Sequence, residues 1–192
     1  TYASRIQASE GCTVTALEGT YNFDPTAYVD TEAYSISTDG ETWTVKAKIT
    51  SAEGFKEALS NGGSIEFGED VDTTESFDIT TDTVIDFNGK TLNRNGYSSV
   101  LNINSGADVT LKNGSLRVSS PSIVVWVQGA TLTCEDMNVT NCITSVHALG
   151  ADVIIRGGAY YAFNLNTDAE NNKPATLTIS GKTYIYLGQI KK

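Results

Sequence analysis

The sequence predicts an all-β protein, built around a right-handed parallel β-helix of about five coils. A short helix is expected to cap the N-terminal end of the β-helix, and a small β-rich arm precedes it. Three observations carry this prediction: an internal repeat of 21 to 24 residues, a helix signature just before the first coil, and a change of pattern near residue 49. The predicted parts are an arm at 1–48 and a β-helix at 49–192, with the capping helix at 50–61.

The repeat is marked by four alanines, which are separated by 23, 21 and 24 residues: Ala107, Ala130, Ala151 and Ala175. Each is followed by a short alternating apolar strand, usually a Gly or Asn turn, and a second strand. Strands and turns at this period are typical of a solenoid, in which no coil buries its apolar face alone. We therefore expect four apolar residues to lie side by side in adjacent coils: Val109, Leu132, Val153 and Leu177.

Alternation within each strand predicts which residues point outward. The middle residues of the four strands are Thr110, Thr133, Ile154 and Thr178, of which Ile154 is the exception to a polar outer face. The first coils, over 64–92, fit less regularly, because Ile85 and Phe87 both point inward only if one residue is inserted relative to later coils. At about 4.8 Å per coil, the stack is expected to be roughly 25 Å tall.

The segment before the first coil has the signals of a helix. Thr50-Ser51-Ala52-Glu53 is a capping-box pattern, apolar residues follow at helical spacing, and Gly62-Gly63 predicts the end. An open β-helix end exposes unpaired strand edges, so we interpret this helix as a plug.

The arm is turn-rich, and residues 34–37 and 43–47 flank Asp39-Gly40 as in a β-hairpin. It is too short for a robust core of its own, so it packs on the helix or orders against another subunit.

Composition excludes several classes of protein. The 192 residues are 40% hydrophobic and carry 23 acidic and 13 basic side chains, a net charge of −10. Such an acidic surface repels phosphate backbones, so we expect no nucleic-acid partner. No apolar run approaches the roughly twenty residues that a membrane span needs, so we expect no membrane partner.

Cysteine usage leaves one question open. The three cysteines are odd in number and lack metal-ligand spacing, and no cofactor or metal is predicted. Cys134 and Cys142 fall within one coil, where they either form a disulfide or fill core positions as free thiols.

Two sets of charged residues occupy equivalent positions of successive coils. Asp108 and Asp152 lie two coils apart, and we interpret them as turn residues rather than as a pair of catalytic carboxyls. A second row alternates in charge: Lys112, Glu135 and Arg156. Attraction between opposite charges on neighbouring strands explains this alternation, although such groups also bind sugar acids.

The remaining polar candidates are also interpreted as structural. The single histidine, His147, aligns with Trp126 and Ile103 and is interpreted as an ordinary coil residue rather than a general base. The acidic residues crowding 69–82 are interpreted as a solvated rim, with calcium binding as the alternative. No catalytic site is predicted.

Aromatic residues are the most suggestive feature. Exposed Tyr and Trp side chains stack on sugar rings and also anchor subunit interfaces. The alternative is that they cap the last coil. The predicted carbohydrate-binding or subunit-interface residues are Trp126, Tyr160, Tyr161, Tyr184 and Tyr186.

Two stretches resemble a known superfamily. ITSAEGFKEALSNGGSIEFGEDV at 49–71 and TVIDFNGKTL at 83–92 are similar to the opening of many β-helix domains in phage structural proteins and bacterial surface proteins. With the coils, the similarity to the pectate-lyase-like right-handed parallel β-helix superfamily covers about residues 49–188. The resemblance implies the fold rather than a function, because this scaffold carries lyases, hydrolases, adhesins and inert spacers.

We therefore expect a non-enzymatic structural or attachment protein of a phage virion, such as a head fibre, a decoration protein or a tail-spike-like module. Residues 1–48 would attach the protein to a larger assembly. The protein would be a homotrimer and would bind host-surface glycans weakly. One alternative is the β-helix domain of a secreted adhesin on a bacterial cell surface. Another is a polysaccharide lyase or hydrolase.

Overall fold

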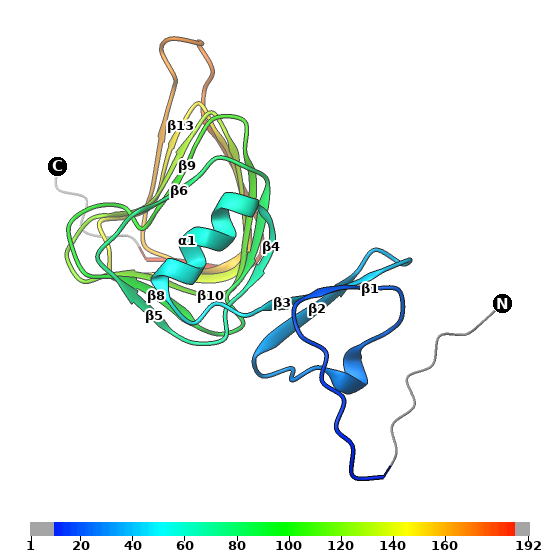
Figure 1. Cartoon of the computed structure of the whole chain (residues 1–192). Coiled ribbons are helices and arrows are strands. Elements are labelled where there is room, and N and C mark those ends of the chain that lie inside the picture. The colour runs from blue at the N-terminus through cyan, green and yellow to red at the C-terminus, as the bar shows by residue number, and fades with distance from the viewer. Residues whose placement is uncertain (1–9, 187–192) are drawn as a thin grey trace. The chain divides into compact units, whose positions relative to one another are not determined.

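The computed structural model describes residues 10–186; residues 1–9 of the predicted arm and 187–192 of the predicted β-helix lie outside the described part. The chain divides into two compact units, Thr1–Lys48 and Ile49–Lys192 (Figure 1). We call them the arm and the solenoid and describe each by itself.

The arm contains a three-stranded antiparallel sheet in the order β1-β3-β2, with β1 at Gly19–Tyr21, β2 at Tyr34–Thr38 and β3 at Trp43–Ala47. A 3-10 turn, η1, spans Thr26–Tyr28. The predicted hairpin is confirmed: β2 pairs with β3, and the carboxylate of Asp39 closes the turn by accepting the N–H of Glu41 at 2.9 Å and of Thr42 at 2.7 Å. Among residues 10–48, only Ala16, Pro25 and Val45 are buried, so the arm has little core.

The solenoid is a right-handed parallel β-helix of about five coils, as predicted. Its larger sheet contains β4 (Gly63–Glu66), β5 (Val71–Thr73), β7 (Thr83–Asp86), β8 (Thr91–Arg94), β10 (Asp108–Val118), β12 (Thr131–Val139), β14 (Asp152–Tyr160) and β16 (Thr176–Ile185). The smaller sheet contains β6 (Phe77–Ile79), β9 (Leu101–Ile103), β11 (Ile123–Gln128), β13 (Thr144–Leu149) and β15 (Phe163–Asn166).

The predicted alignment of coils is confirmed. Val109 pairs with Leu132, Leu132 with Val153, and Val153 with Leu177, so each lies beside the next in adjacent strands. The first three are at most 1% exposed and belong to one continuous apolar core. The middle residues of these strands form a neighbouring row on the outer face, in which Ile154 lies between Thr133 and Thr178.

The first coils differ from the prediction in where the insertion lies. Ile85 pairs directly with Leu111 and needs no inserted residue. The extra residues follow: four residues (87–90) separate Asp86 from Thr91, whereas two (113 and 114) separate Lys112 from Ser115. The longer turn folds the Phe87 ring into the core, 4.8 Å from the ring of Phe67.

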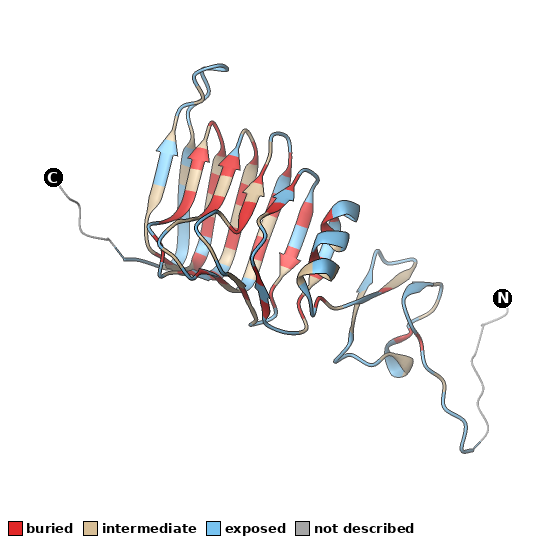
Figure 2. Ribbon diagram, turned by 60° about the vertical axis from the view of Figure 1, so that its left-hand side comes forward, coloured by how far each residue is buried: buried red, intermediate tan, exposed pale blue. Residues whose placement is uncertain are grey.

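The helix α1 (Ala52–Asn61) covers the N-terminal end of the solenoid, as predicted (Figure 2). Its Phe55 ring is fully buried and packs edge-on against the rings of Phe67 and Phe77, at 5.1 and 4.8 Å between centroids. The N-cap is Ser51, one residue later than the capping-box pattern placed it, and its hydroxyl accepts the Gly54 N–H at 3.1 Å. No helix within residues 10–186 is long and apolar enough to cross a membrane.

The larger sheet bends at the same point in four successive coils. The bend residues have positive φ angles of 57°, 51°, 94° and 68°: Asn113, Asp136, Gly157 and Gly181. Asn, Asp and Gly tolerate this left-handed region better than other residues, which explains the turn residues of the repeat.

The three cysteines are free thiols, and Cys134 and Cys142 are buried. Burial raises the pKa of the Cys134 thiol to about 12, so it carries almost no reactive thiolate near neutral pH. We expect a disulfide reagent at pH 8 to modify Cys12, which is exposed, within minutes and to reach Cys134 only after unfolding. Mass spectrometry of the labelled peptides would check this; rapid labelling of Cys134 in the folded chain would contradict it.

Candidate functional site

A row of charged residues crosses the outer face of the larger sheet. Glu66, Asp86, Lys112, Glu135 and Arg156 occupy the same position in successive coils. The Lys112 Nζ atom lies 3.2 Å from Asp86 Oδ2, and Arg156 Nη1 lies 2.9 Å from Glu135 Oε1. Sequence reasoning found the last three members and missed the first two, because the insertion after Asp86 obscures the alignment of the early coils.

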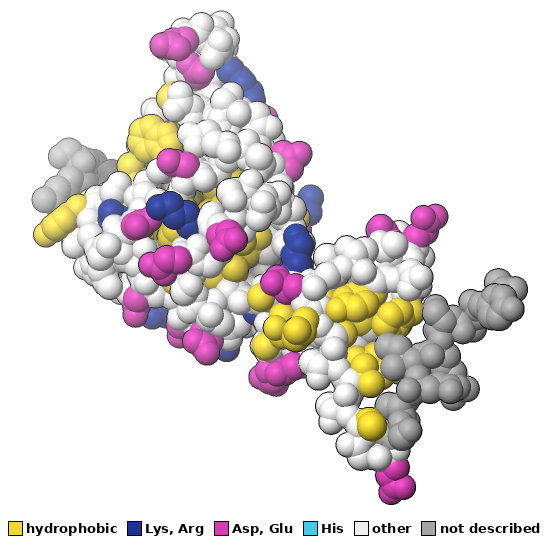
Figure 3. Space-filling model, viewed as in Figure 1, with side chains coloured by type: hydrophobic (Ala, Val, Ile, Leu, Met, Phe, Trp, Pro, Cys, Tyr) yellow, Lys and Arg dark blue, Asp and Glu magenta, His cyan; other side chains and the backbone are white. Residues whose placement is uncertain are grey.

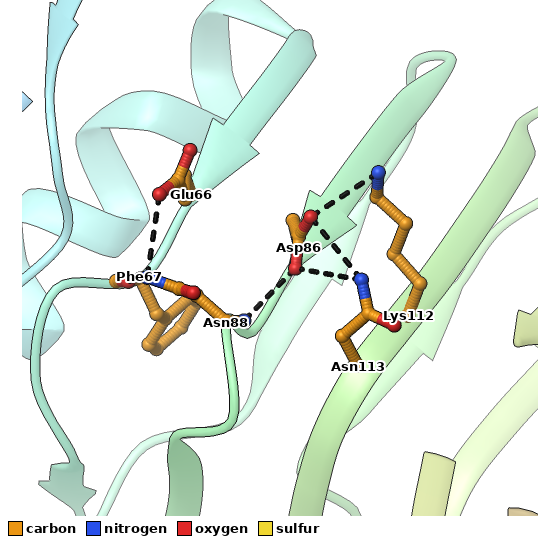
Figure 4. A network of polar contacts seen from close by, with 6 residues as sticks. All are labelled: Glu66, Phe67, Asp86, Asn88, Lys112 and Asn113. Carbon is orange, nitrogen blue, oxygen red and sulfur yellow. Dashed lines mark hydrogen bonds and ion pairs between the residues drawn. The ribbon is translucent and has the colours of Figure 1, made fainter. Parts of the chain in front are cut away.

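Polar groups inside this row satisfy one another (Figure 4). The Asp86 carboxylate accepts the backbone N–H of Asn88 at 2.9 Å and the side-chain amide of Asn113 at 3.2 and 3.3 Å. The Asn88 amide in turn donates to Glu66 Oε1 at 3.3 Å. The charged groups of this row therefore pair with groups on neighbouring coils. Such an arrangement fits stabilisation of the stack better than binding of a sugar acid.

This interpretation predicts a small energetic effect. In a double-mutant cycle of Glu135→Ala and Arg156→Ala, the coupling free energy should be at most about 1 kcal/mol, because both side chains are more than a third exposed and water screens the pair. Urea unfolding of the two single variants and the double variant measures it. A coupling free energy above roughly 2 kcal/mol would contradict the interpretation of this ion pair as a weak, exposed contact between coils.

Asp108 and Asp152 share a row, but Thr131 lies between them and Thr176 follows. The Asp152 carboxylate accepts the Thr176 hydroxyl at 2.7 Å and lies 3.4 Å from Lys173 Nζ. The Thr176 hydrogen bond lowers the pKa of Asp152, which is the opposite of what a general acid requires. The geometry therefore matches the interpretation of these two residues as turn and strand-start residues.

The outer face of the smaller sheet carries a second row: Asp78, Asn102, Trp126, His147 and Asn164. Trp126 and His147 lie side by side as predicted, and their rings stack at 4.2 Å with 9° between planes. Ile103 was expected in this row, but Asn102 takes that place. Ile103 instead pairs with Val127 and points into the core, where it is fully buried.

The Trp126–His147 stack limits what the indole can bind. A sugar stacks on the face of an aromatic ring, and His147 already covers one face of Trp126. Burial lowers the pKa of His147, so the imidazole is neutral at pH 7, and its Nε2 atom lies 3.3 Å from the Asn166 amide. Its Nδ1 atom is buried and makes no hydrogen bond.

Tyr160 does not lie on the surface. It is 0% exposed, its hydroxyl donates to the carbonyl of Gly157 at 3.2 Å, and burial raises its pKa. The strand bends at Gly157 and Gly158, and this shifts the alternation, so that Tyr160 points inward beside Val139 and Ile185. Tyr160 is therefore a core residue, and the prediction of a carbohydrate-binding or interface role for it is wrong.

The other tyrosines of the predicted site lie in or next to the C-terminal coil. Tyr184 and Tyr186 are 50% and 54% exposed, and Lys182 Nζ lies 5.6 Å from the Tyr184 ring centroid. The Tyr186 N–H donates to the Tyr160 carbonyl at 2.8 Å, so strand pairing continues past β16 and brings Tyr186 beside Tyr161, which is half-buried. Trp126 lies apart from them, on the smaller sheet.

The last coil leaves core positions uncovered, a feature that sequence reasoning missed. Ile179, Ile185 and Leu165 are 44%, 39% and 39% exposed, although their partners one coil earlier are fully buried. Within the described residues, β16 pairs with β14 on one side and with no strand on the other. We call this surface, formed by β15 and β16, the open end; Figure 2 shows it at the opposite end of the stack from α1.

A hollow of about 520 Å³ lies beside α1 and β5, lined mainly by polar residues that include Asp70, Asp72 and Asn95. The ion pair of Lys56 and Glu75, at 2.9 Å, contributes to its wall. In the part of the chain from 10 to 186, no three His, Cys, Asp or Glu side chains gather as a metal-ligand set.

The arrangement as a whole defines a parallel β-solenoid with one end covered by a helix and the other end open. A scan against protein-family models, a search of the curated proteins and a search of the solved structures each find no match to this chain.

Proposed function

We propose that the chain is a non-enzymatic structural or attachment module, most simply an accessory of a phage virion such as a head fibre, a decoration protein or a tail-spike-like module. The solenoid would serve as a rigid spacer, and the arm would hold it to a larger assembly. The same physical role would suit a β-helix domain of a bacterial surface adhesin, which differs in where the assembly is located.

One observation carries this proposal: the ion pairs Asp86–Lys112 and Glu135–Arg156 join neighbouring coils on the outer face of the larger sheet, while exposed apolar side chains lie at the open end. Ion pairs along a stack hold neighbouring coils together, whereas an enzyme needs several functional groups that converge on a substrate in a concave pocket. An uncovered apolar end favours a role in assembly.

Weak glycan binding is part of the proposal, and the exposed rings of Tyr184 and Tyr186 support it best. On a glycan array, Tyr184→Ala/Tyr186→Ala should lose most of any signal. Trp126→Ala should retain it, because His147 covers one face of the indole. Loss of the glycan signal in Trp126→Ala but not in the double tyrosine variant would place the glycan site on the smaller sheet.

Location tests the proposal directly. An antibody against the chain should label purified virus particles and sediment with them through a density gradient. Labelling of intact bacterial cell walls instead would favour the adhesin. Incubation with a panel of acidic polysaccharides should release no product; turnover that is lost in Asp152→Asn would overturn the non-enzymatic assignment.

A further inference from the structure

Two of the edge strands within residues 10–186 are β16 at the open end and β2 in the arm, and they lie in different units. At the open end, the Thr176 N–H donates to the Ala151 carbonyl at 2.9 Å, toward β14. Backbone groups alternate sides along a strand, so the N–H groups of Leu177 and Ile179 point away from β14. Apolar side chains of the last coil lie next to this free edge.

In the arm, β2 is one of the two edge strands of the sheet, with β1 at the other edge. The Ala33 carbonyl accepts the Lys48 N–H at 2.9 Å and the Asp39 N–H donates to Thr42 at 3.3 Å, both toward β3. By the same alternation, the N–H groups of Ile36 and Thr38 point to the free side, whereas the Tyr34 N–H donates to the Asp30 carbonyl at 2.9 Å. The sequence of β2, Tyr-Ser-Ile-Ser-Thr, contains no proline or charge, the usual protections of an exposed edge.

The two edges are complementary in charge. Residues 10–48 contain seven acidic and two basic residues, a net charge of −5, and after Glu170 the sequence contains four lysines and no acidic residue. In the described chain, Lys182 lies within β16 and Lys173, which pairs with Asp152 at 3.4 Å, precedes it, whereas four carboxylates bracket β2: Asp30, Glu32, Asp39 and Glu41. Opposite local charges steer two surfaces together and fix their orientation.

Apolar surface is present on both sides as well. Figure 3 shows hydrophobic side chains gathered on the face of the arm turned to the viewer. Tyr34, Ile36 and Trp43 are each partly exposed, which is consistent with the small core of this unit. Docking the arm on an apolar surface would supply the burial that the arm lacks.

We propose that the open end of one copy binds the arm of a second copy, with β2 added as a further strand beside β16. The contact is heterologous, so repetition gives either a closed ring, such as the homotrimer expected from the sequence, or an open fibre. This inference goes beyond the proposed function, because it does not depend on which assembly contains the chain.

Other pairings of two copies fit less well. Two open ends in contact would place lysines against lysines. The end covered by α1 offers the polar outer face of the helix, with Glu53, Lys56 and Glu57 exposed, and its large apolar residues Phe55 and Leu59 are buried.

The test uses two full-length variants that block different sides of the contact. Ile179→Asp places a charge in the open end, and Glu32→Lys/Glu41→Lys reverses the charge beside β2. In sedimentation velocity, the wild-type chain should form trimers or longer species. Each variant alone should be monomeric at the same concentration, with the contact weakened at least about tenfold. An equimolar mixture should form a one-to-one heterodimer, because one intact arm and one intact open end remain.

Matched controls keep the outcome interpretable. Ile143→Asp changes an isoleucine that is 59% exposed on another coil, and Glu57→Lys/Glu69→Lys makes the same change of net charge in the solenoid. Both should assemble like the wild type. Far-ultraviolet circular dichroism verifies folding, and Lys182→Glu provides a milder block of the open end should Ile179→Asp misfold.

Three results would overturn the inference. The first is a wild-type chain that stays monomeric at roughly 100 µM, a concentration that reveals even a weak contact. The second is a mixture of the two variants that forms no heterodimer, as expected for two open ends in contact or for an unrelated partner. The third is loss of assembly in the controls equal to that in the variants.

Discussion

Gly158→Ala should lower the free energy of unfolding by about 3 kcal/mol or more, because it combines backbone strain with a steric collision. Gly158 has a φ of 100°, which side-chain-bearing residues rarely adopt, and a Cβ at this position would collide with the backbone carbonyl of Met137 in the preceding coil. Neither Gly158 nor Met137 can move without breaking the strand pairing between their two coils.

The matched control is Gly106→Ala. Gly106 has a similar φ of 89°, but no atom lies within 4 Å of the added Cβ, so only backbone strain of about 1–2 kcal/mol remains. Urea unfolding followed by circular dichroism measures both variants. If the two variants lose the same free energy of unfolding within error, the coils do not approach one another at Gly158 as described.

The second large effect should come from Phe87→Ala, which should cost about 3–5 kcal/mol. The Phe87 ring is fully buried, lies 4.8 Å from the ring of Phe67 and fills the space made by the inserted residues of its coil. Its removal leaves a cavity beneath the helix-capped end of the stack. Tyr97→Ala, at a residue that is 83% exposed, should change stability by at most about 0.5 kcal/mol. Equal effects in the two variants would place Phe87 outside the core.

The coils could be predicted because their signal is local and repeated. Val109, Leu132, Val153 and Leu177 each follow a marker alanine by two residues, so one period aligns the four strands without any knowledge of tertiary structure. The helix was predictable for the same kind of reason, since cap, apolar face and glycine stop all lie within about a dozen residues.

What could not be predicted depends on bends and on neighbours. Alternation places Tyr160 outward when it is counted from Ile155, but the bend at Gly157 and Gly158 changes the alternation and turns Tyr160 into the core. The early charged residues Glu66 and Asp86 were missed because inserted residues displace the repeat there. Exposure at the open end was missed because Ile179 has the same sequence signature as a buried residue of an interior coil.

The central claim is that successive 21- to 24-residue segments lie as adjacent parallel strands. Nuclear Overhauser measurements on isotope-labelled protein test it most directly, since protons on strands about 4.8 Å apart are close enough to give backbone cross-peaks. In the parallel β-helix, we expect cross-peaks that connect Leu111 with Cys134, Cys134 with Ile155, and Ile155 with Ile179. Cross-peaks joining these segments in antiparallel order, or their absence in an otherwise well-resolved spectrum, would contradict the β-helix.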